Sequence, residues 1–102
     1  MTPKLVRDNI PMIIERDGSE PVWRNATIFE MNEMLIDKIR EEINEFQESP
    51  CLDEAADIYE VFLKMIEHWN MNIDNVKMVA DNKRYIRGSF NEGIILEDIK
   101  RP

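Results

Sequence analysis

The sequence predicts an all-α protein, a bundle of about three main helices with irregular N- and C-terminal segments, completed by oligomerisation. Three observations lead to this prediction. Apolar residues recur every three or four positions through two long segments, which is the spacing of one helical face. Only three Gly and five Pro occur in 102 residues. The composition, 43% hydrophobic and 33% charged, is that of a globular chain, and the length predicts one domain over residues 1–102.

The first 25 residues are expected to hold one short helix and a connector. An apolar cluster at residues 10–14 predicts one or two helical turns, with Asp8 as N-cap, Pro11 in the first turn and Gly18 after the end. The stretch 19–25 reads as an extended connector, and a strand over residues 21–24 is an alternative there.

The first long helix is expected to start after Thr27. Glu30 follows Thr27 at the spacing of a capping box, and the next twenty residues contain neither Gly nor Pro. Its apolar residues define a single stripe. They are Ile28, Met31, Leu35, Ile39, Ile43 and Phe46.

A second helix is predicted from about residue 50 to 69, with Ser49 as N-cap and Pro50 at the first helical position. Its apolar residues are spread widely around the circumference, so it is expected to pack on more than one side, as a central helix or a dimer interface does.

A third helix is predicted from a cap at Asn72 or Asp74 to about Arg87, and Gly88 is expected to stop it. We expect two sets of apolar residues to be buried, one on this helix and one in the tail that packs back on the body. They are Ile73, Val76, Val79, Ala80 and Ile86, then Phe90, Ile94, Ile95 and Leu96.

Two acidic pairs suggest a metal site. Glu42 and Glu45 lie three residues apart on the first long helix, and Glu54 and Asp57 lie three apart on the second. Residues i and i+3 share a helical face, so two antiparallel helices can bring four carboxylates together. Such a cluster repels itself unless a cation is bound, and hard oxygen ligands suit Mg²⁺ or Mn²⁺. The alternative is a solvated acidic face.

Several other classes of site and partner are excluded. A di-iron carboxylate bundle needs a Glu-x-x-His motif on two helices, whereas the chain has one histidine, His68. One Cys and one His also exclude a zinc site of the usual kind. A net charge of −8 argues against binding of a nucleic-acid polymer. The chain has no apolar run of the roughly 18 residues that a membrane span needs, and we expect a cytoplasmic protein.

The basic residues Lys83, Arg84 and Arg87 stand out in this acidic chain. They are expected near the C-terminal end of the third helix. Two interpretations remain open: favourable interaction with the helix dipole and the acidic body, or binding of phosphates.

Five stretches of the sequence together resemble a known family. They are EEINE at 41–45, EAAD at 54–57, KLVRDNIP at 4–11, NKRYIRGSF at 82–90 and EGIILED at 92–98. The first two resemble the MazG-like, all-α nucleoside triphosphate pyrophosphohydrolase superfamily. The other three are similar to its small single-domain branch related to phosphoribosyl-ATP pyrophosphohydrolase.

The resemblance implies a Mg²⁺-dependent hydrolase that cleaves a nucleoside triphosphate between its α and β phosphates, and a homodimer or homotetramer. It implies that the four paired acids are the metal ligands and that Glu41 is a further ligand or the base that orients water. It also implies residues that hold phosphates or close the site. These are Lys83, Arg87, Asn82 and Arg84, with Arg7 and Asp8 in the N-terminal motif.

Two alternatives stay open beside a house-cleaning hydrolase of nucleotides. One is the phosphoribosyl-ATP reaction of histidine biosynthesis, which requires recognition of a second phosphate-bearing ribose. The other is a catalytically silent helical interaction or regulatory module.

Overall fold

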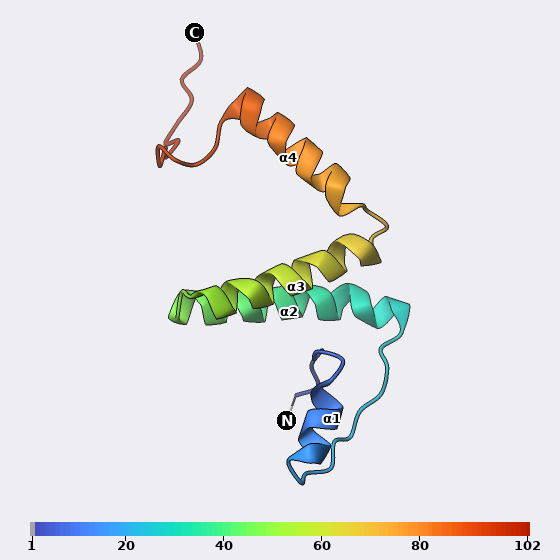
Figure 1. Ribbon diagram of the computed structural model, residues 1–102. Coiled ribbons are helices and arrows are strands. Elements are labelled where there is room, and N and C mark those ends of the chain that lie inside the picture. Colours follow the sequence, from blue (N-terminus) through green and yellow to red (C-terminus); the bar gives the residue numbers. More distant parts are fainter. Residues whose placement is uncertain (1) are drawn as a thin grey trace.

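The computed structural model describes residues 2–102, which form four helices and no strand. They are α1 (Ile10–Arg16), α2 (Ile28–Glu48), α3 (Leu52–His68) and α4 (Ile73–Arg87). The all-α prediction is confirmed, and the alternative of a strand over residues 21–24 is wrong. α2 and α3 lie side by side and antiparallel, with α1 on one side of them and α4 on the other (Figure 1). No helix within residues 2–102 is both long and apolar enough to cross a membrane.

The short helix α1 begins one residue later than predicted. Its N-cap is Asn9 and not Asp8, because the Asn9 carbonyl accepts the first i+4 hydrogen bond, from the Ile13 N–H at 3.0 Å. The predicted stop is confirmed. Gly18 has φ +93°, a conformation that glycine adopts readily, and its N–H donates to the Glu15 carbonyl.

The capping box at the start of α2 is present as predicted. The Glu30 N–H donates to Thr27 Oγ1 at 3.1 Å, and the Thr27 N–H donates to Glu30 Oε1 at 3.0 Å. Arg24, in the preceding connector, donates to the same Glu30 oxygen at 2.7 Å. These bonds fix the direction from which the connector enters α2.

The turn between α2 and α3 differs from the prediction. Ser49 is the C-cap of α2, and its N–H donates to the Glu45 carbonyl at 3.0 Å. Pro50 disfavours the helical conformation at the residue before it, so it ends α2 instead of opening α3. The N-cap of α3 is Cys51, and the helix begins at Leu52.

The core lies between α2 and α3 and is small. Leu35 on α2 and Ile66 on α3 are the buried apolar residues of the described chain, at 1% and 8% exposure. Two members of the predicted stripe are exposed, Ile28 and Ile43. Ile28 is exposed because α3 ends before it reaches this residue. The last residue of α3, His68, contacts Asn32 at 2.7 Å, and Asn32 lies one turn after Ile28 on α2.

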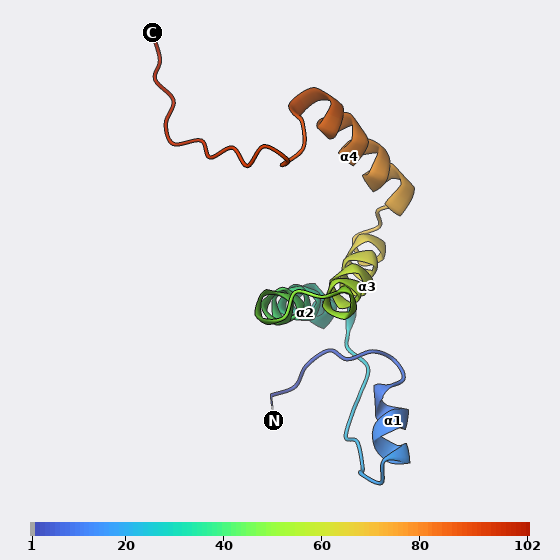
Figure 2. The same cartoon turned by 60° about the vertical axis from the view of Figure 1, so that its left-hand side comes forward.

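α4 begins as predicted, with the Asn72 side chain accepting from the Asp74 N–H at 2.8 Å, and Gly88 is its C-cap. The predicted burial of its apolar face and of the tail is wrong for the single chain. Val76 and Ile73 are half-buried, but the other seven residues are exposed, and Phe90 is 98% exposed. The reason is geometric: α4 turns away from the α2–α3 pair, and the tail continues outward (Figures 1 and 2).

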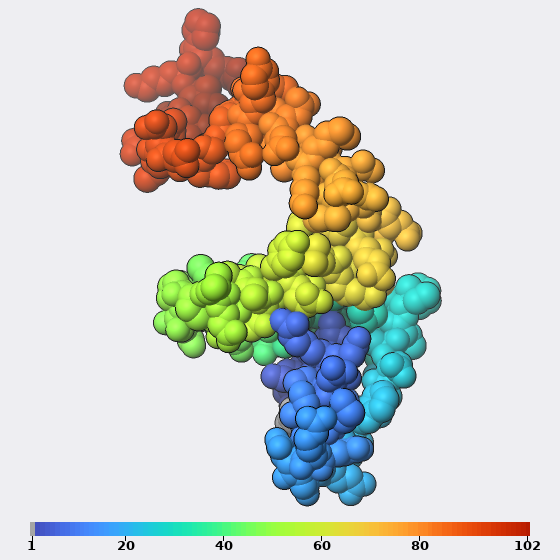
Figure 3. All heavy atoms as spheres, in the orientation of Figure 1, coloured from blue at the N-terminus to red at the C-terminus, as the bar shows by residue number. Residues whose placement is uncertain are grey.

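The molecule is accordingly long and open, with extents of 66 × 31 × 25 Å. In the space-filling view, α4 adjoins the end of α3, and open space separates the far end of α4 and the tail from the α2–α3 pair (Figure 3). α2 against α3 is the one extensive helix–helix contact among residues 2–102. That contact alone determines where the acidic pairs lie.

The capping box predicts a pH dependence of stability. The hydrogen bonds from Arg24 and from the Thr27 backbone lower the pKa of Glu30 to about 2, from an ordinary value of 4.5. A carboxylate with a lowered folded-state pKa stabilises the fold above its unfolded pKa, and this contribution is lost as the pH falls. We expect the urea midpoint of the native protein to exceed that of Glu30→Gln at pH 6, and the difference to shrink between about pH 4.5 and 2.

The matched control is Glu33→Gln, which removes an exposed carboxylate on the same helix without touching the cap. A difference between the native protein and Glu30→Gln that stays constant from pH 6 to pH 2 would contradict the assignment.

Candidate metal centre

The two predicted acidic pairs meet at one point between α2 and α3. One carboxylate oxygen from each of Glu42, Glu45, Glu54 and Asp57 lies within 4.8 Å of the other three. The i, i+3 spacing sets two acids on one face of each helix, and the antiparallel packing turns these faces toward each other. The convergence predicted from the sequence is therefore present, and we call these four residues the carboxylate cluster.

The carboxylate cluster is partly buried. Glu42 is 5% exposed, Glu54 and Asp57 are half-buried, and Glu45 is exposed. The Oε2 atoms of Glu42 and Glu54 are buried without a hydrogen-bond partner among residues 2–102. A buried carboxylate oxygen without a donor is costly, and a divalent cation satisfies it. These two atoms and the all-oxygen donor set fit Mg²⁺ or Mn²⁺.

The pKa of Glu42 reflects its burial and the nearby charged side chains. Burial raises the pKa of Glu42, Lys38 at 3.3 Å lowers it, and the neighbouring Glu45 raises it again, so that the net pKa change is upward. The folded protein thus disfavours the ionised form of Glu42. A cation bound by the carboxylate cluster reverses this preference, because it interacts with the charged form.

Glu41 lies beside the carboxylate cluster with both oxygens already paired. Lys4 donates to its Oε1 at 3.3 Å and Lys38 to its Oε2 at 3.4 Å. Burial raises the pKa of Glu41, but the two lysines outweigh it, and the net pKa change is downward. Glu41 therefore stays ionised, and Lys38 links it to Glu42 of the carboxylate cluster.

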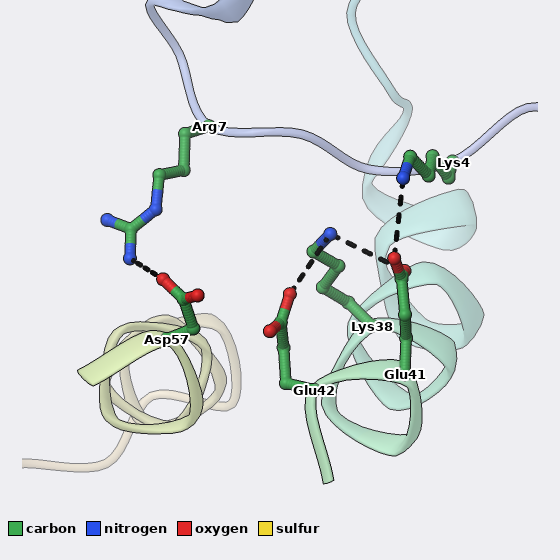
Figure 4. Close-up of polar contacts among 6 residues, drawn as sticks. All are labelled: Lys4, Arg7, Lys38, Glu41, Glu42 and Asp57. Carbon is green, nitrogen blue, oxygen red and sulfur yellow. Dashed lines mark hydrogen bonds and ion pairs between the residues drawn. The ribbon is translucent and has the colours of Figure 1, made fainter. Parts of the chain in front are cut away.

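The N-terminal segment places two cations over the acids. Arg7 donates to Asp57 Oδ1 at 2.7 Å, while Lys4 bonds Glu41 on the other helix (Figure 4). The hydrogen bond to Asp57 raises the pKa of Arg7. Arg7 was predicted near the site and is found there, whereas Asp8 is exposed. Lys4 was not predicted, although it stands three residues before Arg7 in the KLVRDNIP motif.

The basic residues of α4 are not brought to the carboxylate cluster within one chain. Asn82, Lys83, Arg84 and Arg87 are exposed on the last turns of α4, at the end farther from the α2–α3 pair (Figure 1). Arg84 pairs with Asp81 on its own helix at 3.1 Å. The single chain thus holds the acidic and basic parts of the predicted site apart.

A metal-dependent stability follows from the unpartnered oxygens. Mg²⁺ at about a hundred times its dissociation constant should stabilise the native protein by about 2.7 kcal/mol, if it binds only the folded state. Glu42→Gln removes one ligand and should abolish this protection, while raising the stability of the metal-free protein by relieving repulsion. The measurement is urea unfolding in EDTA and in Mg²⁺.

Glu48→Gln is the control, since Glu48 is exposed on the same helix and outside the carboxylate cluster. Equal Mg²⁺ protection of the native protein and Glu42→Gln would remove Glu42 from the ligand set.

Comparisons of the chain with protein-family models, with curated proteins and with solved structures gave no match. The resemblance to the MazG-like superfamily therefore rests on the sequence motifs and stays a prediction. What the structure adds is independent of it: a partly buried carboxylate cluster with two unpartnered oxygens, contacted by Arg7 at Asp57 and by Lys38 at Glu42.

Proposed function

We propose that the protein is a Mg²⁺-dependent hydrolase that converts a nucleoside triphosphate to its monophosphate and pyrophosphate, in a house-cleaning role. The carboxylate cluster, with the buried Oε2 atoms of Glu42 and Glu54 lacking donors, is the observation that carries the proposal. The motifs at both ends of the chain supply the reaction class through their resemblance to nucleotide pyrophosphohydrolases.

In this proposal Glu42, Glu45, Glu54 and Asp57 hold Mg²⁺, with Mn²⁺ as a substitute. The ion would polarise the phosphoryl group and lower the pKa of a bound water. Glu41 is the remaining acid of the EExxE stretch, and it is held ionised by Lys4 and Lys38. In this proposal Glu41 orients the attacking water once one of its oxygens is released by a lysine, and its lowered pKa suits it to accept a hydrogen bond from that water more than to keep its proton.

The substrate brings about four negative charges to a protein whose own net charge is −8. Divalent ions that bridge carboxylates and phosphates make this approach tolerable, and cationic side chains offset the charge that develops on the leaving pyrophosphate. Lys83 and Arg87 are the candidates on α4, with Asn82 and Arg84 beside them, and Arg7 is the candidate already at the carboxylate cluster.

Because the α4 residues lie away from the carboxylate cluster of their own chain, we infer that a homodimer or homotetramer completes the site. The exposed apolar residues of α4 and of the tail give a second copy a surface to cover. The basic end of α4 from one copy would then approach the acids of another. Opposite charges favour that arrangement.

The phosphoribosyl-ATP reaction remains a second enzymatic candidate, because the terminal motifs resemble those of the branch related to that enzyme. A catalytically silent helical module is the candidate from another class. Two buried carboxylate oxygens without donors are unfavourable in a protein that binds no cation, which speaks against the silent module.

The deciding experiment measures pyrophosphate release from canonical and modified nucleoside triphosphates and from phosphoribosyl-ATP, each with Mg²⁺ and with EDTA. Metal-dependent release establishes the reaction, and the ranking of substrates separates the two enzymatic candidates. Folded protein that releases pyrophosphate from none of them favours the silent module.

Removing a single ligand tests the site. Glu45→Gln and Asp57→Asn should each reduce turnover to below roughly a hundredth of the native rate, because the Mg²⁺-dependent stabilisation of the transition state is lost. Helix content by circular dichroism should be unchanged. Glu48→Gln is the control and should keep native turnover, and full activity in either ligand variant would falsify the assigned site.

The two-copy site predicts complementation between inactive variants. Asp57→Asn lacks an acidic residue and the double variant Lys83→Gln, Arg87→Gln lacks the basic ones, so each alone should be inactive. In a dimer with random pairing, an equal mixture should recover about a quarter of native activity, since half of the dimers are mixed and each holds one intact site.

Sedimentation of the native protein at micromolar concentration should show a dimer or tetramer. A strictly monomeric profile, or a mixture of variants that stays inactive although mixed dimers form, contradicts the two-copy site.

A further inference from the structure

The segment from Pro3 to Asp8 crosses the α2–α3 pair above the carboxylate cluster, and we call it the basic strap. It holds two cations three residues apart, each bonded to a different helix: Lys4 to Glu41 on α2 and Arg7 to Asp57 on α3. Between them the half-buried Leu5 lies along α2, where it lines a shallow hollow with Met34. Figure 4 shows the strap running across both helices.

The two contacts of the basic strap differ in one respect. Glu41 is outside the carboxylate cluster, so the Lys4 contact leaves that cluster free. Asp57 is a member, so Arg7 occupies one oxygen, Oδ1, of a carboxylate that belongs to the candidate metal site. The contact at 2.7 Å is at the short end of the ordinary range for a charge-assisted hydrogen bond.

The negative charge of the carboxylate cluster is not fully compensated by the basic side chains around it. Lys38 contacts Glu42 Oε1 at 3.3 Å, but Glu42 Oε2 is buried without a partner in the described part of the chain, and Glu42 itself is more than nine-tenths buried. Glu54 Oε2 is also a buried oxygen without a hydrogen-bond partner in that part of the chain. In the carboxylate cluster, Arg7 and Lys38 each compensate one acid, and these two oxygens remain for a cation.

We propose that Arg7 is a built-in competitor for the divalent cation: its guanidinium offsets the charge of Asp57 through Oδ1 in the metal-free protein, and the cation displaces it from Asp57 on binding to the four acids. Metal binding then frees the guanidinium of Arg7 directly above the site, where it can bond a phosphate. The inference rests on the metal site of the proposed function, and it adds an autoinhibitory contact to it.

The physical basis is exchange of one cation for another at the same carboxylate. Arg7 is about half exposed, so its pair with Asp57 belongs to the weaker class of ion pairs and can be displaced. A divalent ion held by several oxygens gains more at Asp57 than a single guanidinium does. Arg7 therefore lowers the apparent affinity for the metal without preventing binding.

The test is a titration of the protein with Mg²⁺ alone, without nucleotide, measured by isothermal titration calorimetry. Removing the competitor in Arg7→Gln should tighten Mg²⁺ binding about two- to fivefold, which is the range expected for an exposed ion pair. Arg7→Lys keeps a cation near Asp57 and should bind Mg²⁺ within about twofold of the native protein.

Arg24→Gln is the matched control, because it makes the same substitution in an arginine that pairs with Glu30, outside the carboxylate cluster. Its Mg²⁺ affinity should equal that of the native protein. A second readout is the thermal midpoint: Arg7→Gln should melt below the native protein in EDTA and together with it in saturating Mg²⁺.

Three results overturn the inference while leaving the metal site intact. The first is unchanged or weaker Mg²⁺ binding by Arg7→Gln, and the second is equal tightening by Arg24→Gln. The third is a melting difference between the native protein and Arg7→Gln that persists in saturating Mg²⁺, since the Arg7–Asp57 pair would then survive metal binding. Absence of Mg²⁺ binding by the native protein and by Arg7→Gln overturns the metal site, and with it both this inference and the proposed function.

Discussion

Four carboxylates that converge within 4.8 Å are the constraint on which the rest of this structure depends. Their mutual repulsion opposes the packing of α2 on α3, which is also the one extensive helix–helix contact of residues 2–102. Leu35 and Glu42 are seven residues apart and so lie on nearly the same side of α2, two turns from each other. The face that buries Leu35 in the core therefore also buries Glu42, and apolar packing and charge repulsion act on the same helix pair.

The cations around the carboxylate cluster follow from this constraint. Lys38 lies one turn before Glu42 on α2, and Lys4 and Arg7 lie on the basic strap. Each of these three side chains contacts a carboxylate within 3.4 Å. A protein that bound nothing here would be more stable with fewer acids. Four acids with incomplete compensation fit the proposed metal site, where an external cation is bound, better than a structural salt-bridge network, in which each acid is paired within the chain.

Features that depend on neighbours in the chain were predictable, and features that depend on distant segments were not. The capping box at Thr27 and the i, i+3 acids are local patterns, and both were predicted correctly. The Ser49–Pro50 pair was misread because the same dipeptide can open a helix or close one, and only the hydrogen bond from Ser49 to the preceding turn decides. The bond between Arg7 and Asp57 spans 50 positions, so no local pattern indicates it. The predicted burial of Ile28 was wrong for a similar reason, since it depends on where α3 ends.

The apolar residues of α4 and the tail are a second feature of the single chain that lacks a partner within residues 2–102. At 15 residues α4 is near the length at which an isolated helix is only marginally stable in water, so contacts over its apolar residues are needed to hold it. Its last turns are basic, and the carboxylate cluster is acidic. In the proposed oligomer a second copy satisfies both needs at once: it covers the exposed apolar residues, and it brings cations to the acids. The open single chain leaves the basic end of α4 away from the carboxylate cluster, and this separation is the physical reason for proposing a site shared between copies.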